Sequence, residues 1–425
     1  MTTDAMGDMG DTGNSGATDK TVLCLASYEK GDEFLRAAKR RGWRTILVTV
    51  TALEHADWPR ESIDEFFHMP DLSKLEDVVK AVSYLARTRA IARIVPLDDY
   101  DVETAAALRE HLRLPGMDAS RARLWRDKLA MRVRAREAGI PVPEFVHVLN
   151  DDAIRTFTER VPPPWVLKPR SEVSTIGIAK VGSAEDLWQR VDELGDRRSF
   201  FLLERFVPGG VYHADSIVAD GAVVFAETHG YARPPLEVFH EGGIAMTRTL
   251  PRDSDDARAL LELNRRVVAA LGMARGAAHV EFIKGEADGH VHFLEAGARV
   301  GGANIVDVVE AATGVNLWRE WARLELGPEG EVYAAPERKR EYAGVILTLA
   351  RQEQPDTSAY DDAEIAQRIV KRHHAGLIIA SPDAERVRTL LDDYSQRFAT
   401  DFFASLPPTT DPKASRDAAL QVEGQ

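Results

Sequence analysis

The sequence of 425 residues contains one cysteine, Cys24, which lies in an apolar run. A single cysteine cannot form an internal disulfide, so we expect a reducing compartment, the cytoplasm. Apolar runs long enough to cross a bilayer are absent, and the first residues lack the basic and apolar regions of a signal peptide. Basic charge is not in excess either, because the net charge is −14. Nucleic acid and anionic membranes would repel such a chain, and we expect neither as a partner.

The N-terminal part lacks a dinucleotide motif. Residues 1–20 have no hydrophobic periodicity and predict a disordered tail. Strand and helix patterns then alternate over residues 21–119, which predicts a small parallel-sheet domain. The first strand is followed by ASYEKG instead of G-x-G-x-x-G, which argues against a dinucleotide site. Asp98 and Asp99 follow a later strand, where they either bind a substrate amine or form a turn and cap the helix that begins near Val102.

Two short apolar runs bounded by glycine predict a pair of strands, His279–Ile283 and Val291–Glu295. An odd-length loop centred on Asp288 would set Glu281 directly opposite Glu295. Two carboxylates so close repel each other unless a positive charge lies between them. Mg²⁺ suits such an oxygen pair, particularly when it shares the phosphates of a substrate. The alternative is an ordinary hairpin in which one glutamate faces solvent.

Four motifs precede this hairpin. Asp127 and Lys128 open a predicted helix, and Lys168 ends the apolar strand WVLKP. A loop of small residues follows at 171–178, and Glu204 ends the next strand, FLLERFVPGG. A lysine at the end of an apolar strand is a partly desolvated charge that needs an anion. The alternative for Lys168 is an edge lysine that snorkels to solvent.

The order of these motifs, together with the form LEAGARVGG, resembles the ATP-grasp superfamily from about residue 21 to residue 327. Within it the chain looks most like carboxylate–amine ligases of the L-amino-acid ligase (dipeptide synthetase) type, and biotin carboxylases are a more distant match. The resemblance implies an α/β fold, α+β in the grasp part. Its expected parts are a Rossmann-like pre-grasp domain (21–119), a lid subdomain (120–208), a catalytic core (209–327), a C-terminal α/β lobe (328–405) and a flexible tail (406–425).

After residue 327 the sequence shows no catalytic motif. The runs YAGVILTLA and HAGLIIA predict strands, whereas residues 363–374 and 383–398 predict helices. We expect them to form the smaller C-terminal lobe.

The resemblance implies a nucleotide site that binds ATP. Hinge residues of this superfamily read adenine through backbone groups, at positions that correspond to Glu204 and Val207. The acidic residue that many relatives use for ribose is replaced by Val211, which leaves His213 as the nearest polar candidate. The implied ATP-binding residues are Lys128, Lys168, Ser174, Thr175, Gly177, Glu204, Arg205, Val207 and His213.

The resemblance also implies a metal and substrate site. Glu281 and Glu295 would hold one or two Mg²⁺, with Mn²⁺ as a substitute, while the usual third ligand, an asparagine, is Gly297 here. Arg299 would have one of two roles: it would stabilise the transferring phosphoryl group or acyl phosphate, or it would form a bidentate contact with a substrate carboxylate. Lys168 is the second catalytic candidate. The remaining candidates for substrate contact, in a segment that could equally be plain surface, are His229, Arg233 and His240.

These residues predict an ATP-dependent carboxylate–amine ligase that forms an amide through an acyl phosphate, between amino acids or similar small acids. Its partners would be small carboxylates and amines, and a homodimer is left open. Three alternatives remain: a biotin-carboxylase-like enzyme that phosphorylates bicarbonate, a kinase that stops at phosphoryl transfer, and a non-catalytic nucleotide-binding protein.

Overall fold

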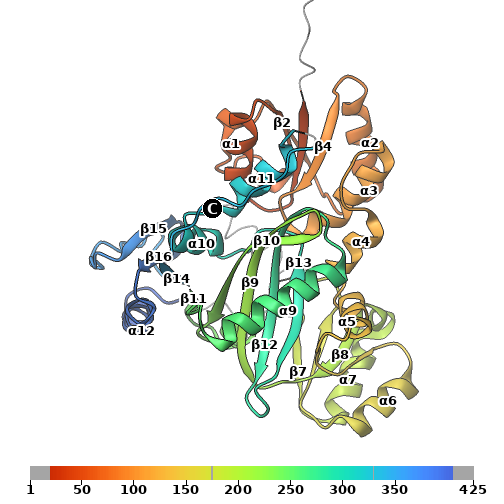
Figure 1. The fold of residues 1–425 in the computed structure, drawn as a ribbon. Coiled ribbons are helices and arrows are strands. Elements are labelled where there is room, and N and C mark those ends of the chain that lie inside the picture. The colour runs from red at the N-terminus through yellow and green to blue at the C-terminus, as the bar shows by residue number, and fades with distance from the viewer. Residues whose placement is uncertain (1–19, 174–175, 329, 405–425) are drawn as a thin grey trace, which may run out of the picture.

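The computed structural model of the protein describes residues 20–173, 176–328 and 330–404, and it contains three sheets (Figure 1). The predicted tails, 1–20 and 406–425, lie outside these residues apart from Lys20. None of the helices in the described part combines the length and apolar character needed to cross a bilayer. The mixture of one parallel and two antiparallel sheets confirms the predicted α/β class.

The first sheet has the strand order β3-β2-β1-β4, and all neighbours are parallel. Alternate residues of β1 point to opposite faces. Cys24 therefore packs toward α1 and α11, while Leu23 packs toward α2 and α3. The elements of this part are β1 (Thr21–Ala26), α1 (Asp32–Arg40), β2 (Arg44–Val50), β3 (Glu65–Met69), α2 (Leu75–Ala86), β4 (Ile91–Pro96), α3 (Val102–Leu112) and, from farther along the chain, α11 (Leu317–Leu326).

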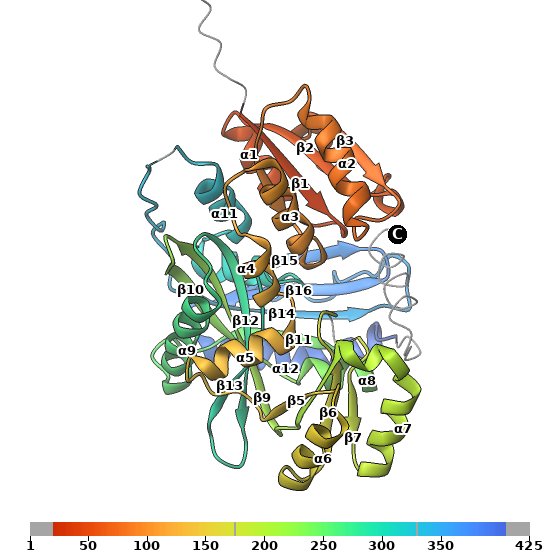
Figure 2. The same ribbon diagram turned by 90° about the vertical axis from the view of Figure 1, so that its right-hand side faces the viewer.

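The second sheet is antiparallel, with the order β5-β8-β6-β7, and lies at the end of the molecule opposite the first sheet (Figures 1 and 2). Trp165, Leu167 and Leu203 form a core with α6 and α7 on one face. The strand alternation sends Lys168 and Glu204 to the other face. The elements here are α4 (Ala119–Leu124), α5 (Lys128–Glu137), β5 (Phe145–His147), α6 (Asp151–Arg160), β6 (Trp165–Pro169), β7 (Ala179–Val181), α7 (Ala184–Leu194) and β8 (Phe201–Arg205).

The third sheet has eight strands in the order β13-β12-β9-β10-β11-β14-β16-β15, and α9 lies across one face (Figure 1). Its strands are β9 (Gly209–Ala219), β10 (Ala222–Tyr231), β11 (Ala245–Thr249), β12 (Gly276–Gly285), β13 (Val291–Gly297), β14 (Tyr342–Leu349), β15 (Ile365–Lys371) and β16 (His374–Ser381). The remaining helices are α8 (Pro235–Glu241), α9 (Asp255–Leu271), α10 (Ile305–Thr313) and α12 (Ala384–Asp401).

The last three strands extend this sheet, because β14 pairs with β11 along residues 344–347. The helix predicted at residues 363–374 is wrong: β15 and the start of β16 occupy it. Residues 365–371 pair with β16 at the sheet edge, and this pairing outweighs a local helical pattern. The helix predicted at residues 383–398 is confirmed as α12.

Candidate active site

A pocket that is partly open to solvent lies where the loop after β4, the start of α5 and the end of β13 meet. Three residues predicted for the nucleotide, metal or catalytic site line it, and so does Asp99, one of the two candidates for a substrate amine. Arg126 and His279 also line it and were not predicted. The lining residues are Lys128, Glu295 and Arg299, then Asp99, Arg126 and His279, and finally Trp125, Met131, Val173, Ala296 and Gly297.

The hairpin of β12 and β13 brings the two glutamates together. Glu281 and Glu295 are direct partners in the antiparallel ladder, as predicted, although a β-bulge between Glu281 and Phe282 sets this register instead of an odd-length loop centred on Asp288. Gly289 in the connecting turn has the left-handed φ of 67°. Glu281 accepts a hydrogen bond of 2.9 Å from the Tyr231 hydroxyl, and its Oε1 lies 3.5 Å from His279 Nε2. Burial raises the pKa of Glu281, but the hydrogen bond and charge of His279 outweigh this and lower it.

Lys128 approaches Glu295 from the first residue of α5. Asp127 caps this helix by accepting hydrogen bonds from the backbone N–H groups of the next turn. The Lys128 Nζ lies 3.1 Å from Glu295 Oε2 and donates a 2.5 Å hydrogen bond to the Glu172 carbonyl. The lysine is 5% exposed, so its charge is held at the floor of the pocket.

Lys168 forms a buried ion pair with Glu204, and Arg132 Nε lies 3.0 Å from the same carboxylate. Burial lowers the pKa of Lys168, and the positive charge of Arg132 lowers it further. The negative charge of Glu204 raises this pKa, but not enough to restore its ordinary value. Burial raises the pKa of Glu204, but its two cations hold it below its ordinary value. Arg132 was missed in the sequence, although it lies one turn after Lys128 on α5 and so faces the same way.

Arg299 closes the pocket from the other side. Its Nε lies 3.1 Å from Asp99 Oδ2, and Arg126 Nη1 lies 3.6 Å from the same atom. Asp99 is 7% exposed, and within the described residues its Oδ1 has no hydrogen-bond partner. A Cβ added to Gly297 would lie 3.4 Å from this oxygen and from Arg299 Cγ. Glycine at the usual asparagine position therefore lets Asp99 and Arg299 approach β13 closely.

Comparison with known proteins agrees with this architecture, although no family model matches the chain. The solved structure of an L-amino acid ligase from Bacillus licheniformis superposes with a TM-score of 0.70 at 18% identity, covering 92% of this chain and all (100%) of that one. Carboxyaminoimidazole ribonucleotide synthase from Aspergillus clavatus, complexed with ATP, gives 0.69 at 16% identity, covering 89% of this chain and 99% of that one. The chain has the ATP-grasp fold. The predicted resemblance is thereby confirmed.

A sequence relative of this ATP-grasp chain is an L-arginine-specific L-amino acid ligase from Bacillus subtilis. The two are 24% identical over 263 residues, which are 60% of this chain and 62% of the relative. The chain thus spans less than two thirds of the length of this relative.

The structure buries two histidines that were predicted to bind ligands. His213 is fully buried, and its ring nitrogens lie 2.7 Å from Asp215 Oδ2 and 2.8 Å from Thr247 Oγ1. No ring nitrogen remains for ribose, so the ribose prediction for His213 is corrected. His229 is also fully buried, within β10 instead of a surface loop, and this removes it from the substrate candidates.

The remaining predicted residues either do not line the pocket or lie outside the part of the chain that the structure describes. Arg205 is half exposed, pairs with Glu144 at 3.2 Å and does not line the pocket. Arg233 lies 3.9 Å from Glu237 near the surface. Gly177 has a φ of 71°, and Val207 is half-buried. Three predicted contacts fall outside the described residues or side chains, namely Ser174, Thr175 and His240.

Proposed function

We propose that this protein is an ATP-dependent carboxylate–amine ligase that joins amino acids or similar small acids through an acyl phosphate. The observation that carries the proposal is the pairing of Glu281 with Glu295, which lies beside the buried Lys128 in a pocket that Arg299 also lines. Opposed carboxylates next to fixed cations are suited to a polyphosphate substrate and its metal ion. The L-amino acid ligases among its relatives support the same chemistry.

Glu281 and Glu295 would hold Mg²⁺, and their chemistry fits this ion because both supply carboxylate oxygens from adjacent strands. The bound ion would neutralise charge on the transferring phosphoryl group. Glu295 is only partly buried, with 34% of its side chain exposed, so an ion can reach it from the pocket.

In the proposed reaction a substrate carboxylate oxygen attacks the γ-phosphorus of ATP, and ADP leaves. Lys128 and Lys168 would hold the phosphates in line and offset their charge. The amine nitrogen then attacks the acyl carbon, phosphate leaves, and the nitrogen loses a proton to give the amide. Arg299 would orient the acyl phosphate through its planar guanidinium, which Asp99 holds in place.

The test incubates the purified protein with ATP, Mg²⁺ and pools of amino acids, and measures phosphate release alongside mass spectrometry of new amides. We expect phosphate release that depends on two amino acids and matches the amide formed. ADP release that depends on bicarbonate would instead support the carboxylase alternative, although the chain has no Met-Lys segment that could accept biotin. A stable phosphorylated product would indicate a kinase, and ATP binding without turnover under any substrate would indicate a non-catalytic protein.

A further inference from the structure

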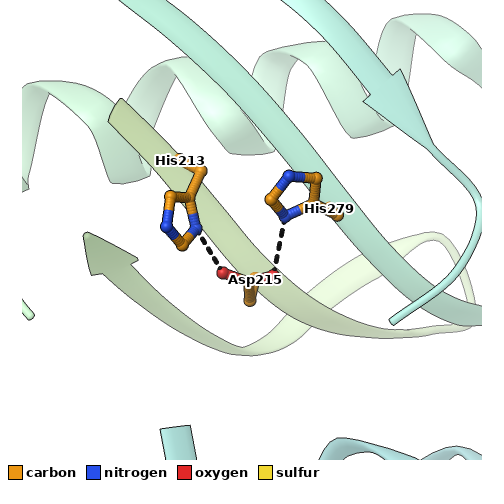
Figure 3. A group of neighbouring side chains, drawn as sticks. All are labelled: His213, Asp215 and His279. Carbon is orange, nitrogen blue, oxygen red and sulfur yellow. Dashed lines mark hydrogen bonds and ion pairs between the residues drawn. The ribbon is translucent and has the colours of Figure 1, made fainter. Parts of the chain in front are cut away.

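A cluster of buried polar side chains lies directly behind Glu281. Its centre is Asp215 on β9, which is flanked by His213 on the same strand and His279 on β12 (Figure 3). The Nδ1 atom of His213 lies 2.7 Å from Asp215 Oδ2, and that of His279 lies 2.8 Å from Asp215 Oδ1. A third imidazole approaches the same carboxylate, because His229 Nδ1 lies 3.4 Å from Asp215 Oδ2, and Asp215 is fully buried.

The cluster continues at both ends. At one end the Nε2 atom of His279 lies 3.5 Å from Glu281 Oε1. At the other end the Nε2 atom of His213 lies 2.8 Å from Thr247 Oγ1. The polar groups therefore form a continuous chain that starts in the sheet interior at Thr247 and ends on the carboxylate at the edge of the candidate active site.

Two histidines and an aspartate could also bind a metal ion, but these distances favour hydrogen bonds. Ligand atoms about 2.0–2.1 Å from a tetrahedral ion lie roughly 3.3–3.4 Å from each other. Asp215 Oδ2 and Oδ1 lie only 2.7 Å and 2.8 Å from the two Nδ1 atoms, which is the usual hydrogen-bond range. The imidazoles thus bond to the carboxylate itself.

We propose that Asp215 and His279 are positioning residues that fix the Glu281 carboxylate in the orientation needed to hold the catalytic cation. The inference rests on the proposed function, because it takes Glu281 as a cation ligand. Asp215 fixes the ring of His279 through Nδ1, which aims Nε2 at Glu281 Oε1. Outer partners of this kind commonly set the orientation and basicity of metal ligands.

The packing around the pair is tight enough for such a role. Asp215 lies directly opposite His279 in the ladder between β9 and β12, and His213 lies opposite Glu281. A Cβ added to Gly301 would lie 2.7 Å from Asp215 Oδ1 and 3.1 Å from His279 Nδ1. The backbone of Gly301 therefore covers the hydrogen bond, and only glycine fits there without displacing it. Gly301, the first of the two glycines that end the LEAGARVGG motif, therefore has a specific structural role.

The test measures cation binding directly, with the full-length protein in the presence of ADP and Mn²⁺ as a paramagnetic probe for Mg²⁺. Titration followed by the electron paramagnetic resonance signal of free Mn²⁺ gives the dissociation constant.

Asp215→Asn keeps the shape of the side chain but has only one acceptor oxygen, so it cannot accept a hydrogen bond from an imidazole on each side. We therefore expect Mn²⁺ binding to weaken by roughly 10- to 100-fold. Ser216→Ala is the matched control: Ser216 is the next residue on β9, fully buried, and its Oγ accepts a hydrogen bond from Asn264. It should lower the melting temperature while leaving Mn²⁺ affinity unchanged.

A second pair of variants tests the same hydrogen bond without changing any polar group. Gly301→Ala should weaken Mn²⁺ binding because its Cβ displaces the Asp215–His279 pair. Gly302→Ala should not, because no atom lies within 4 Å of the corresponding Cβ. This pair decides the question if Asp215→Asn does not fold.

Three outcomes would overturn the proposal. Wild-type affinity in both Asp215→Asn and Gly301→Ala would remove the positioning role and leave the proposed function intact. No Mn²⁺ binding in the wild type, or unchanged binding in Glu295→Gln, would overturn the cation site and the proposed function with it. A tightly held metal ion that remains in Glu295→Gln and is lost in His213→Ala would show that the cluster is itself a metal centre.

Discussion

Glu281 and Glu295 face each other across the β12–β13 ladder, yet different partners hold them. Glu281 is bonded to Tyr231 and lies beside His279, both from the sheet, whereas Glu295 lies 3.1 Å from Lys128 on α5. Each carboxylate has a stabilising neighbour of its own, which reduces their mutual repulsion. One glutamate can therefore be changed without removing the contacts of the other.

The first prediction concerns this pair. Glu295→Gln keeps the shape of the side chain but removes half of the charge, so Mg²⁺-dependent ATP turnover should fall by roughly a hundredfold or more, because a metal ion contributes several kcal/mol. The melting temperature without nucleotide should fall by no more than a few degrees, because the buried Lys128 loses its ion-pair partner while the repulsion between the two glutamates is relieved. Glu286→Gln, in the exposed turn of the same hairpin, should change neither value. Strong destabilisation in Glu295→Gln would mean that its role is structural.

The second prediction concerns Lys168. Lys168→Ala should raise the ATP concentration needed for half-maximal rate and lower turnover, at a cost of about 1.5–3 kcal/mol for a lost charge-assisted hydrogen bond. Thermal stability should fall as well, because the buried Glu204 keeps only Arg132 as a cation. Steady-state kinetics and melting curves check the two effects. Lys80→Ala, on the exposed face of α2, is the control for loss of a lysine. Unchanged ATP kinetics in Lys168→Ala would remove this residue from the site.

The third prediction concerns Arg299. Arg299→Lys keeps the positive charge but loses the planar guanidinium that contacts Asp99 and that we propose orients the acyl phosphate. ATP binding should survive, while amide formation should fall by a factor on the order of ten to a thousand. Calorimetry with ATP and product analysis by mass spectrometry separate the two. Full amide synthesis in the lysine variant would show that Arg299 contributes only a distant charge.

The fourth prediction concerns pH and Asp101, which accepts hydrogen bonds of 2.7 Å and 2.6 Å from Ser27 below the pocket. Burial, followed by the neighbouring Asp98, raises the pKa of Asp101 to about 7. Because the folded state keeps this proton and the unfolded state has lost it, stability falls between about pH 4 and pH 7, by up to about 1.4 kcal/mol per pH unit.

Asp101→Asn removes this titration. The variant should therefore gain stability relative to the wild type as pH rises from 5 to 8, as measured by melting temperature at constant ionic strength. A difference that stays the same at every pH would show that Asp101 is ionised throughout the range.

Several site residues could be predicted from the sequence because local pattern places them. Asp127 caps α5 and presents Lys128 at its first turn, and the apolar run before Lys168 forms β6. The sequence places the two glutamates on neighbouring strands, but a β-bulge between Glu281 and Phe282, which the spacing does not report, sets them opposite each other. These features depend on neighbours within about thirty residues of the chain.

The errors arose where distant segments compete with local pattern. Residues 365–371 pair with β16, so a helical pattern became an edge strand. His229 and His213 pair across β9 and β10 and are enclosed by the sheet, although the sequence around His229 is typical of a surface loop. No motif in one sequence reports which polar residues a sheet will bury.

The sequence by itself determined which strands and helices carry the glutamate pair and the two lysines that we propose bind phosphate, since capping and alternation act locally. Only the tertiary structure decided which charges meet. Asp99 and Arg299 are 200 residues apart yet lie within 3.1 Å, and the Asp215–His279 hydrogen bond joins two strands from different parts of the chain. Such contacts form because buried charges must be paired, and the partner that satisfies each charge is set by the packing of sheets and helices.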